Sequence, residues 1–508
     1  MKKLFCMILA LCMIMSGMIF CVSATESDTQ SEDSIASVTV GESTRYYTTF
    51  EEAITAVNAT VGENIITLTL LQDIALNGEK YTISRNNTVV DGGNHTIALT
   101  ATSTGSFLTI TGSDCVVKNM TLDNKVAAYS NGFAHLGTGT SVFENLNVNY
   151  LSNATHNGLN AAFYIKGNTD AKLNLTIKGC AANTGKTRFF ALEGGTQQVE
   201  VTLIDNNFVN PADYGRCADI KGAGSKVIVK NGYYQTNSTA VFRVWGGELI
   251  IEDGLFNLKG NGDTILAAEK YDAASGGSVN IKNGVFLSGN QQTTKKGVIY
   301  SGPGTVNVTS GIFILTKKLA DGYSAIANQD ETVLAFADGQ MIATLGVAPD
   351  TKTGAAVRLK AEPGIRFESA AKGISKSAEV TYGTLVIPKA LLGDKALTHA
   401  AFDGVEDEAL KFADIVAKDG IHYDADGNAT IYAAITGIPY AQNEAVLVAR
   451  AYARVTAGGF TFYVYSETTT ERSMQYVATA AKADAETYNR LNAEQKAMLE
   501  SYINGGAE

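Results

Sequence analysis

The chain has 508 residues and a formal net charge of −11, because 51 Asp and Glu residues outnumber 40 Lys and Arg residues. The length allows two or three domains. The acidic balance argues against nucleic acid as a partner, because nucleic-acid binding depends on basic surfaces.

The first residues, MKKLFCMILALCMIMSGMIFCVSA, place two lysines before an apolar run that ends in small residues. This order is typical of a secretory signal peptide (1–24), and we expect cleavage after Ala24; an uncleaved anchor is the alternative. No later run approaches the roughly 20 apolar residues that a membrane span needs. We therefore expect a mature chain without a membrane span, secreted or associated with a cell surface. Residues 25–44 are rich in Ser, Thr, Asp and Glu and predict a flexible acidic tether.

Three of the six cysteines lie in the signal peptide, and Cys115, Cys180 and Cys217 remain. An odd number without CxxC spacing predicts neither a disulfide framework nor a zinc site. We expect buried free thiols; one disulfide plus a free thiol is the alternative.

The segment TTFEEAITAVNATVGE (48–63) spaces Phe50, Ile54 and Val57 along one helical face, and its opening threonines can cap the helix. Such a helix would protect the open end of a β-structure. The first strands are predicted at 65–76 and 88–99, where apolar and polar residues alternate.

Four similar segments follow at nearly regular intervals: VIVKNGYY (227–234), LIIEDGLF (249–256), VNIKNGVF (279–286) and VNVTSGIF (306–313). Each alternates apolar residues, then has a glycine, then an aromatic residue two positions later. When Phe208 and Asn206 are added to these two columns, the aromatic residues are spaced by 26, 22, 30 and 27 residues. Periods of this length indicate a solenoid, of roughly ten coils here. We expect Asn206 to replace glycine because asparagine tolerates the left-handed backbone conformation.

A second short strand precedes each repeat: FFALEG (189–194), CADIKG (217–222), FRVWG (242–246) and VIYSG (298–302). Residues two and four positions before the final glycine are almost wholly apolar and are predicted to point inward, including Leu192, Ile220, Val244 and Tyr300. The intervening residues are then predicted to point outward: Glu193, Lys221, Trp245 and Ser301 in one column, and Ala191, Asp219, Arg243 and Ile299 in the other. Two or more strands per coil, stacked in register, make a parallel β-helix.

The order of the TTFEEAI cap, the first strands and VVDGGNHTI resembles the start of right-handed parallel β-helix proteins of the pectate-lyase-like superfamily. This solenoid module is found in many bacterial secreted and surface proteins. The resemblance covers residues 45–346. It implies a fold rather than an activity, because the superfamily contains lyases, hydrolases, adhesins and passive spacers.

Beyond the repeats, five alternating segments predict an antiparallel β domain: GIRFESA (364–370), EVTYGTLVIP (379–388), NATIYAAITGIP (428–439), AVLVARAYARV (445–455) and FTFYVYSE (460–467). Two helices are predicted at the end, with Asn492 and Gln495 forming a capping box. GIRF, YGTLVIP, the residues around Arg450 and Arg472-Ser473 resemble a β-rich C-terminal domain of extracellular proteins of anaerobic Firmicutes. The predicted fold class is all-β: a right-handed parallel β-helix solenoid, then a smaller antiparallel β domain (356–508) with C-terminal helices.

The motifs that the resemblance associates with catalysis are missing. The chain has no Asp-Asp pair, which hydrolases of this fold use to hold a general acid and activate water. It has no Gly-His-Gly turn, and the tryptophan-and-histidine signature of pectate lyases is absent. Arg188, Arg216 and Arg243 lie on successive coils and could supply a base, but a catalytic role for them is not the interpretation we favour.

The histidines and a hairpin give weaker indications. His95 is expected to be structural, whereas His135 and His156 lie in predicted irregular loops, where functional residues collect, but without a matched acid. YDADGN (423–428) resembles a calcium loop, so a weak surface Ca²⁺ near Asp424, Asp426 and Asn428 is an alternative to a simple hairpin turn. No other cofactor is expected.

The strongest candidate surface surrounds the only tryptophan. Six residues form it: Trp245, Arg243, Asp219, Lys221, Glu193 and Arg188. Neighbouring coils should place Asp219 beside Arg243 and Glu193 beside Lys221. An exposed aromatic ring flanked by charges suits a sugar ring; the alternative is that ion pairs merely decorate an exposed sheet.

We therefore expect a monomeric, secreted or cell-surface β-helix protein that binds glycan or a surface partner in an adhesin-like manner, without catalysis. The partner would be a polysaccharide, or a glycan or protein on a cell surface. A polysaccharide lyase or glycoside hydrolase with an atypical site is the first alternative, and a structural spacer rod is the second.

Overall fold

The computed structural model describes residues 28–506 except 102, 104, 125–130, 151–160, 168–170, 185–186, 195–197, 212–215, 238–239, 261–265, 269–276, 290–296, 318–321, 329–330, 361, 408–410, 418–420, 422 and 426. The expected signal peptide and cleavage site lie outside these residues. The chain divides into two compact units. Unit 1 comprises Met1–Ile228, Gly232–Leu249 and Glu269–Gly277, and unit 2 comprises Val229–Asn231, Ile250–Ala268 and Ser278–Glu508.

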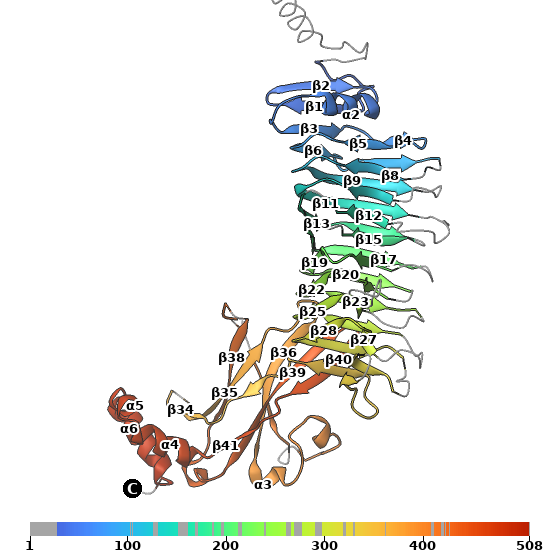
Figure 1. Cartoon of the computed structure of the whole chain (residues 1–508). Helices are drawn as coiled ribbons and strands as arrows, with labels where there is room; N and C mark the ends of the chain where they lie inside the picture. The colour runs from blue at the N-terminus through green and yellow to red at the C-terminus, as the bar shows by residue number, and fades with distance from the viewer. Residues whose placement is uncertain are drawn as a thin grey trace, which may run out of the picture. The chain divides into compact units, whose positions relative to one another are not determined.

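A β-solenoid occupies residues 66–327, which confirms the predicted fold class. It has about eight turns, fewer than the ten expected, and is consistent with a parallel β-helix. Figure 1 shows its strands stacked coil upon coil. The larger sheet contains β1 (Ala36–Val40), β2 (Ser43–Tyr47), β3 (Ile66–Leu70), β4 (Ile74–Leu76), β6 (Thr88–Asp91), β7 (Thr96–Leu99), β9 (Val116–Asn124), β11 (Gly139–Tyr150), β13 (Leu173–Lys178), β14 (Ala181–Thr184), β16 (Val199–Ile204), β17 (Asn206–Asn210), β19 (Ser225–Val229), β20 (Gly232–Thr236), β22 (Glu248–Ile251), β23 (Leu255–Leu258), β25 (Ser278–Ile281), β26 (Val285–Ser288), β28 (Thr305–Val308), β29 (Gly311–Leu315) and β32 (Ile342–Leu345).

A second sheet of the solenoid carries the predicted surface. Its strands are β5 (Tyr81–Ile83), β8 (Ser106–Ile110), β10 (Asn131–His135), β12 (Ala161–Lys166), β15 (Arg188–Glu193), β18 (Ala218–Lys221), β21 (Phe242–Val244), β24 (Leu266–Ala268), β27 (Gly297–Ser301), β30 (Ser324–Ala327) and β31 (Thr332–Leu334). Neighbouring strands from β5 to β21 pair in parallel wherever a register is defined, as in β12 with β15 and β15 with β18. Parallel pairing in register places equivalent residues of successive coils side by side.

The first coil is covered as predicted. Helix α2 (Phe50–Ala59) begins after Thr49, whose side chain accepts a hydrogen bond from the Glu52 N–H, and it buries Phe50, Ile54 and Val57. Strands β1 and β2 form an antiparallel hairpin, and β1 also pairs with β3. The expectation of a flexible tether up to residue 44 is therefore wrong for residues 36–44, because Ala36 and Val38 alternate with polar residues and are buried.

The predicted aromatic column is confirmed in both units. In unit 1, Phe208 lies opposite Tyr234, and both side chains are fully buried. In unit 2, Phe256, Phe286 and Phe313 stack with ring centroids 4.9 Å and 5.4 Å apart. Such stacking buries a large apolar surface in each coil.

The explanation offered for the glycine column needs correction. Gly284 has a positive φ of 145°, and a Cβ atom there would lie 3.0 Å from the Phe286 ring. Asn206 does not have a positive φ; the preceding residue, Asp205, does (52°). Asn206 is instead buried, and its side chain bonds the Ile177 carbonyl and the Cys180 N–H, both at 2.9 Å. Asparagine is suitable there because its amide satisfies two buried backbone groups.

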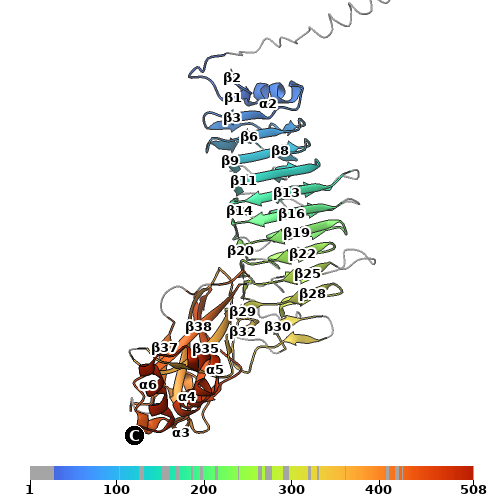
Figure 2. The same ribbon diagram turned by 90° about the vertical axis from the view of Figure 1, so that its left-hand side faces the viewer.

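The C-terminal part of unit 2 contains two antiparallel sheets. The four-stranded sheet holds β33 (Asp350–Thr351), β34 (Ala356–Arg358), β35 (Gly364–Lys372) and β38 (Asn428–Thr436), and the five-stranded sheet holds β36 (Glu379–Pro388), β37 (Ala413–Val416), β39 (Leu447–Ala457), β40 (Phe460–Tyr465) and β41 (Thr470–Arg472). The helices are α3 (Lys389–Leu392), α4 (Met474–Ala483), α5 (Ala485–Asn489) and α6 (Ala493–Ile503), with short 3₁₀ turns η1 (Ala400–Phe402) and η3 (Tyr440–Gln442). Figure 2 shows α4, α5 and α6 grouped together. The predicted capping box of Asn492 and Gln495 opens α6.

The last coils of the solenoid pack against the five-stranded sheet within unit 2. Val285 and Leu287 of β26 and Ile312 and Ile314 of β29 share one buried cluster with residues of β36 and β39. Phe460, Phe462 and Val464 of β40 pack against the same cluster. These strands of the solenoid are thus apolar on both faces, as strands buried on both faces are.

Among the residues that the structure describes, no helix is both long enough and apolar enough to span a membrane.

Candidate functional site

The predicted surface residues lie on three consecutive strands of the second sheet in unit 1. Asp219 of β18 is in register with Ala191 of β15 and with Arg243 of β21. Glu193 is in register with Lys221, as predicted. Trp245 follows β21 directly, and its backbone N–H donates to the Ile220 carbonyl at 2.8 Å. The parallel register therefore brings these side chains together, and we call Arg188, Glu193, Arg216, Asp219, Lys221, Arg243 and Trp245 the cationic patch.

Asp219 differs from the prediction because its side chain is only 1% exposed. The Arg188 Nε donates to Asp219 Oδ2, and the Arg216 Nη1 lies 3.5 Å from the same oxygen. Arg188 and Arg216 therefore cover the carboxylate, which the prediction of an ion pair with Arg243 across the rungs did not include. Ala191, expected to point outward, is also fully buried.

The Trp245 ring is in contact with two cations. The Arg243 guanidinium carbon lies 3.9 Å from the ring centroid, and the Lys221 Nζ lies 4.8 Å from it. Both distances are typical of cation–π contacts. The tryptophan therefore holds two positive charges near each other, and these charges lie over the ring whose exposed face was expected to bind a sugar.

Glu193 also has a partner that was not expected. It accepts a hydrogen bond from the Tyr164 hydroxyl at 2.6 Å, and Tyr164 lies on β12 opposite Ala191. Burial raises the pKa of Tyr164, and the hydrogen bond to Glu193 raises it further. Sequence reasoning missed Tyr164 because the strand AAFYIK is almost wholly apolar, although its alternation with Phe163 places Tyr164 on the outward face.

Cations outnumber carboxylates in this patch. Among the described residues, Arg188, Arg216, Lys221 and Arg243 surround Asp219 and Glu193. Partial burial lowers the pKa of Lys221; Asp219 and Glu193 raise it, and the charges of Arg188 and Arg243 lower it further. Cations that crowd one another in this way favour an anion nearby.

The same arrangement opposes a catalytic base at Arg188 or Arg216. A lyase base must accept a proton from the substrate, whereas the guanidinium groups of Arg188 and Arg216 are directed at Asp219, and a guanidinium has no acceptor site. Their common partner Asp219 therefore supports a binding or structural role over proton abstraction.

The other sequence candidates do not join this patch. His95 Nδ1 lies 3.2 Å from Asp73 Oδ1, and His135 is the fully buried last residue of β10, so its placement in an irregular loop was wrong. His156 lies outside the described residues. Asp424 Oδ1 accepts a hydrogen bond from the Asn428 N–H at 2.8 Å in a hairpin turn, and Asp426 lies outside the described residues.

The second sheet departs from the predicted register at β27. Ile299 and Ser301, both expected to be exposed, are buried, whereas Tyr300 is partly exposed. Apolar residues on both faces of VIYSG left the strand pattern ambiguous.

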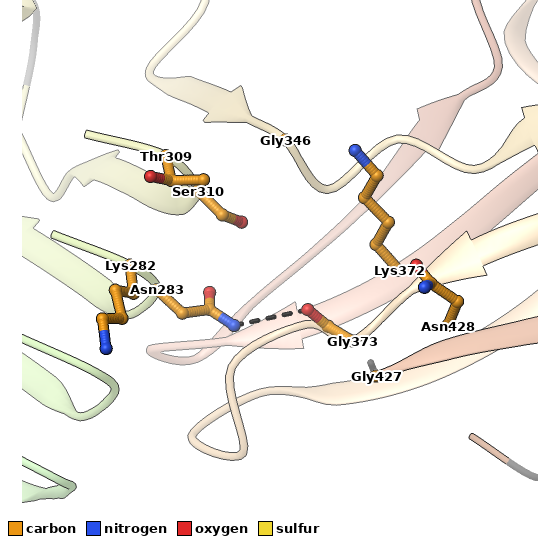
Figure 3. A pocket seen from close by; sticks show the side chains of 9 residues that line it. All are labelled: Lys282, Asn283, Thr309, Ser310, Gly346, Lys372, Gly373, Gly427 and Asn428. Atoms are coloured by element: carbon orange, nitrogen blue, oxygen red, sulfur yellow. Dashed lines mark hydrogen bonds between the residues drawn. The ribbon is translucent and has the colours of Figure 1, made fainter. Parts of the chain in front are cut away.

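A polar cleft of about 320 Å³ lies within unit 2 (Figure 3). Its lining includes Lys282 and Asn283, the hydroxyl groups of Thr309 and Ser310, and Lys372. Lys282 is 3.1 Å from Glu252, and the Asn283 amide bonds the Gly373 carbonyl at 3.3 Å. Figure 3 shows the Lys372 side chain extending toward Gly346. No sequence pattern indicated this cleft, because its walls come from segments far apart in the chain.

Cys115, Cys180 and Cys217 are free and buried, as expected. Burial raises the pKa of Cys180 to about 12. Across the described part of the chain, no group of three or more His, Cys, Asp or Glu side chains is placed to hold a metal ion.

Comparison of the chain with protein-family models, with curated proteins and with solved structures finds no match.

Proposed function

We propose that this chain is a secreted or cell-surface β-helix protein that binds an anionic glycan, without catalysis, through the cationic patch. The observation that carries the proposal is the gathering of four cations around one buried carboxylate and the Trp245 ring. On a chain of net charge −11, a local excess of positive charge needs a reason. Carboxylate or sulfate groups on a polysaccharide would provide one, since arginine binds such groups bidentately.

The β-solenoid also supports a finer inference about origin. The N-terminal cap, the first coils and the aromatic column together favour the pectate-lyase-like type of β-helix, with the right-handed coil of that superfamily. The signal-like first residues favour secretion, and the C-terminal segments favour an origin among anaerobic Firmicutes.

The first test is affinity electrophoresis of the mature chain, Thr25 to Glu508, in gels that contain polygalacturonate, a sulfated glycan or a neutral glucan. We expect retardation in the anionic gels, and weaker retardation there at higher salt, because salt screens exposed charges. Migration unchanged in every anionic gel would overturn the proposal, and a cleared zone of polymer would instead establish a lyase or hydrolase.

Arg243→Ala should abolish most of this retardation, because it removes a partly exposed cation that lies against the Trp245 ring. Lys178→Ala is the matched control: it removes one positive charge from the same unit, at a side chain paired with Glu144 outside the patch. Trp245 is the only tryptophan, so its fluorescence reports directly on the patch. If anionic ligands leave this fluorescence unchanged, they bind elsewhere.

A further inference from the structure

The five-stranded sheet of unit 2 has two different faces. Ala453 and Val455 of β39, with Phe462 and Val464 of β40, face the buried cluster that includes the last coils. Because side chains alternate along strands, the residues between them lie on the opposite face. The register pairs them as Tyr452 with Tyr465, Arg454 with Tyr463 and Thr456 with Thr461. We call this side the tyrosine face.

His399 lies on the tyrosine face and is fixed at both ring nitrogens. Its Nδ1 is 2.8 Å from the Tyr465 hydroxyl, and its Nε2 is 3.1 Å from Asp414 Oδ2. Its backbone N–H also donates to Tyr465 Oη at 2.9 Å. Since the carboxylate only accepts hydrogen bonds, Nε2 carries the proton and Nδ1 accepts from the tyrosine hydroxyl in the neutral ring.

Tyr452 of β39 adds a further hydrogen bond to the network of His399 and Asp414. Its hydroxyl donates to Asp414 Oδ1 at 2.7 Å, which requires its ring to lie over Gly383 of β36. A Cβ atom at Gly383 would lie 2.4 Å from the Tyr452 ring, so only glycine leaves room for this path. The carboxylate of Asp414 therefore has a hydrogen bond at each oxygen, and His399 cannot easily rotate.

Tyr463 is held flat against this fixed histidine. The two rings are stacked with centroids 4.0 Å apart and an angle of 25° between them. The Tyr452 ring meets Tyr463 edge-on at 5.5 Å. Even so, 39% of Tyr463 is exposed. His399 covers one side of the ring and Tyr465 stacks beside it with centroids 6.0 Å apart, so the exposed surface is the part that these rings leave uncovered.

Polar groups surround this exposed ring. Arg454 lies directly opposite Tyr463 on β39, and both Arg454 and Thr461 are exposed. The surroundings suit a pyranose ring, whose C–H face packs on an aromatic ring while its hydroxyl groups bond the polar rim. A peptide anchor would instead need a pocket to enter, whereas Tyr463 lies on the face of a sheet. Its fixed orientation means that little side-chain entropy is lost on binding.

We propose that the tyrosine face is a second glycan-binding site, specific for uncharged pyranose units, with Tyr463 as the stacking platform and His399 as the residue that positions it. The site is independent of the cationic patch, which lies in the other unit and is proposed to bind anions.

The test is affinity electrophoresis of the mature full chain in gels containing hydroxyethyl cellulose, xyloglucan or galactomannan. We expect retardation in at least one neutral gel, and Tyr463→Ala should weaken it about tenfold, whereas Tyr463→Trp should retain it because the platform remains. Tyr476→Ala is the matched control, since it removes a tyrosine that is 58% exposed on α4, outside the tyrosine face.

The outcomes separate the two proposed sites. Neutral ligands should leave the Trp245 fluorescence unchanged, and Tyr463→Ala should leave retardation in polygalacturonate unchanged. Free migration of the wild type in all three neutral gels, or equal retardation of Tyr463→Ala and the wild type, would overturn this inference while leaving the cationic patch untouched. A Tyr463→Ala protein with the wild-type unfolding midpoint excludes loss of folding as the cause.

Discussion

His135 shows how burial alone can change the acid chemistry of a side chain. No part of this residue is exposed, and its ring lies 6.1 Å from that of Phe143. The Gly137 N–H donates to Nδ1 at 3.1 Å, so Nε2 carries the proton of the neutral ring; among the described residues, Nε2 has no hydrogen-bond partner. Burial lowers the pKa of His135 from 6.5 to about 4. The folded chain therefore resists protonation that the unfolded chain accepts readily.

We expect His135 to make the solenoid sensitive to acid between pH 6.5 and pH 4. Above pH 6.5 the ring is neutral in both states and has no effect on the pH dependence. As the pH falls below 6.5, the unfolded state binds a proton and the folded state does not, so the unfolding free energy falls by up to about 3 kcal/mol. In His135→Phe, the unfolding midpoints at pH 7.5 and pH 4.5 should differ less than they do in the wild type.

His95→Gln is the control for this experiment, because His95 lies at the surface beside Asp73. It should keep the pH dependence of the wild type. If His135→Phe shows the same loss of stability between the two pH values as the wild type, other groups cause the acid sensitivity.

Asp219 marks the limit of what alternation along a strand can predict for one residue. The pattern CADIKG indicated correctly that Asp219 points away from the solenoid core and lies beside Arg243. It could not indicate that Arg188 and Arg216 would bend over the carboxylate and bury it. Burial of an outward residue depends on long side chains from neighbouring coils. The alternation of apolar and polar residues along a strand does not predict the rotamers of those side chains.

At the scale of an element, the aromatic column is the part of the fold that the sequence predicts best. A residue that recurs once per coil at a fixed distance from a glycine must occupy equivalent places in the stack. The hairpin of β1 and β2 was missed because it has no repeat to identify it. Its Ser- and Thr-rich composition outweighed the short alternation of Ala36, Val38 and Val40. The capping box was predicted, because capping depends on local sequence alone, but the first of the two predicted C-terminal helices is divided at Asp484 into α4 and α5.

Phe286 should be the most sensitive member of the column in unit 2, because it stacks on both Phe256 and Phe313. Phe286→Ala should lower the unfolding free energy by about 3 to 5 kcal/mol, through lost transfer energy and the cavity left behind. Phe286→Leu retains most of the volume and should cost about 1.5 kcal/mol or less. Urea unfolding followed by circular dichroism measures both.

The comparison between these two variants tests the cause. Equal losses for Phe286→Ala and Phe286→Leu would show that the flat stacked ring matters more than filling the volume. Losses near zero for both would contradict a continuous aromatic column in this unit.

At the scale of the whole molecule, the boundary expected near residue 350 does not separate two independent cores. The unit that holds the C-terminal sheets also holds the coils from Ser278 onward. Hydrogen bonds add to the contacts of the apolar cluster. The carboxylate of Asp253 accepts one from the Ser375 hydroxyl and another, at 2.8 Å, from the Lys376 N–H. Sequence reasoning could not find this arrangement, because VFLS and GIFIL look like ordinary strands until a partner for their outer face is known.

Removal of the C-terminal sheets should therefore expose an apolar surface on the last coils of the solenoid. A mature chain that ends at residue 346 would uncover the outer side chains of Val285, Leu287, Ile312 and Ile314, which are at most 4% exposed in the whole chain. An apolar patch of this kind promotes association, so we expect the truncated chain to form oligomers in size-exclusion chromatography and to bind a hydrophobic dye.

Threonine at these four positions should restore a monomer, because threonine has the β-branched shape that strands favour and is polar. The same four substitutions in the full chain should destabilise it, since they place hydroxyl groups in a buried cluster. A truncated chain that stays monomeric without these substitutions, and binds no dye, would show that the outer face of the last coils does not need the C-terminal sheets.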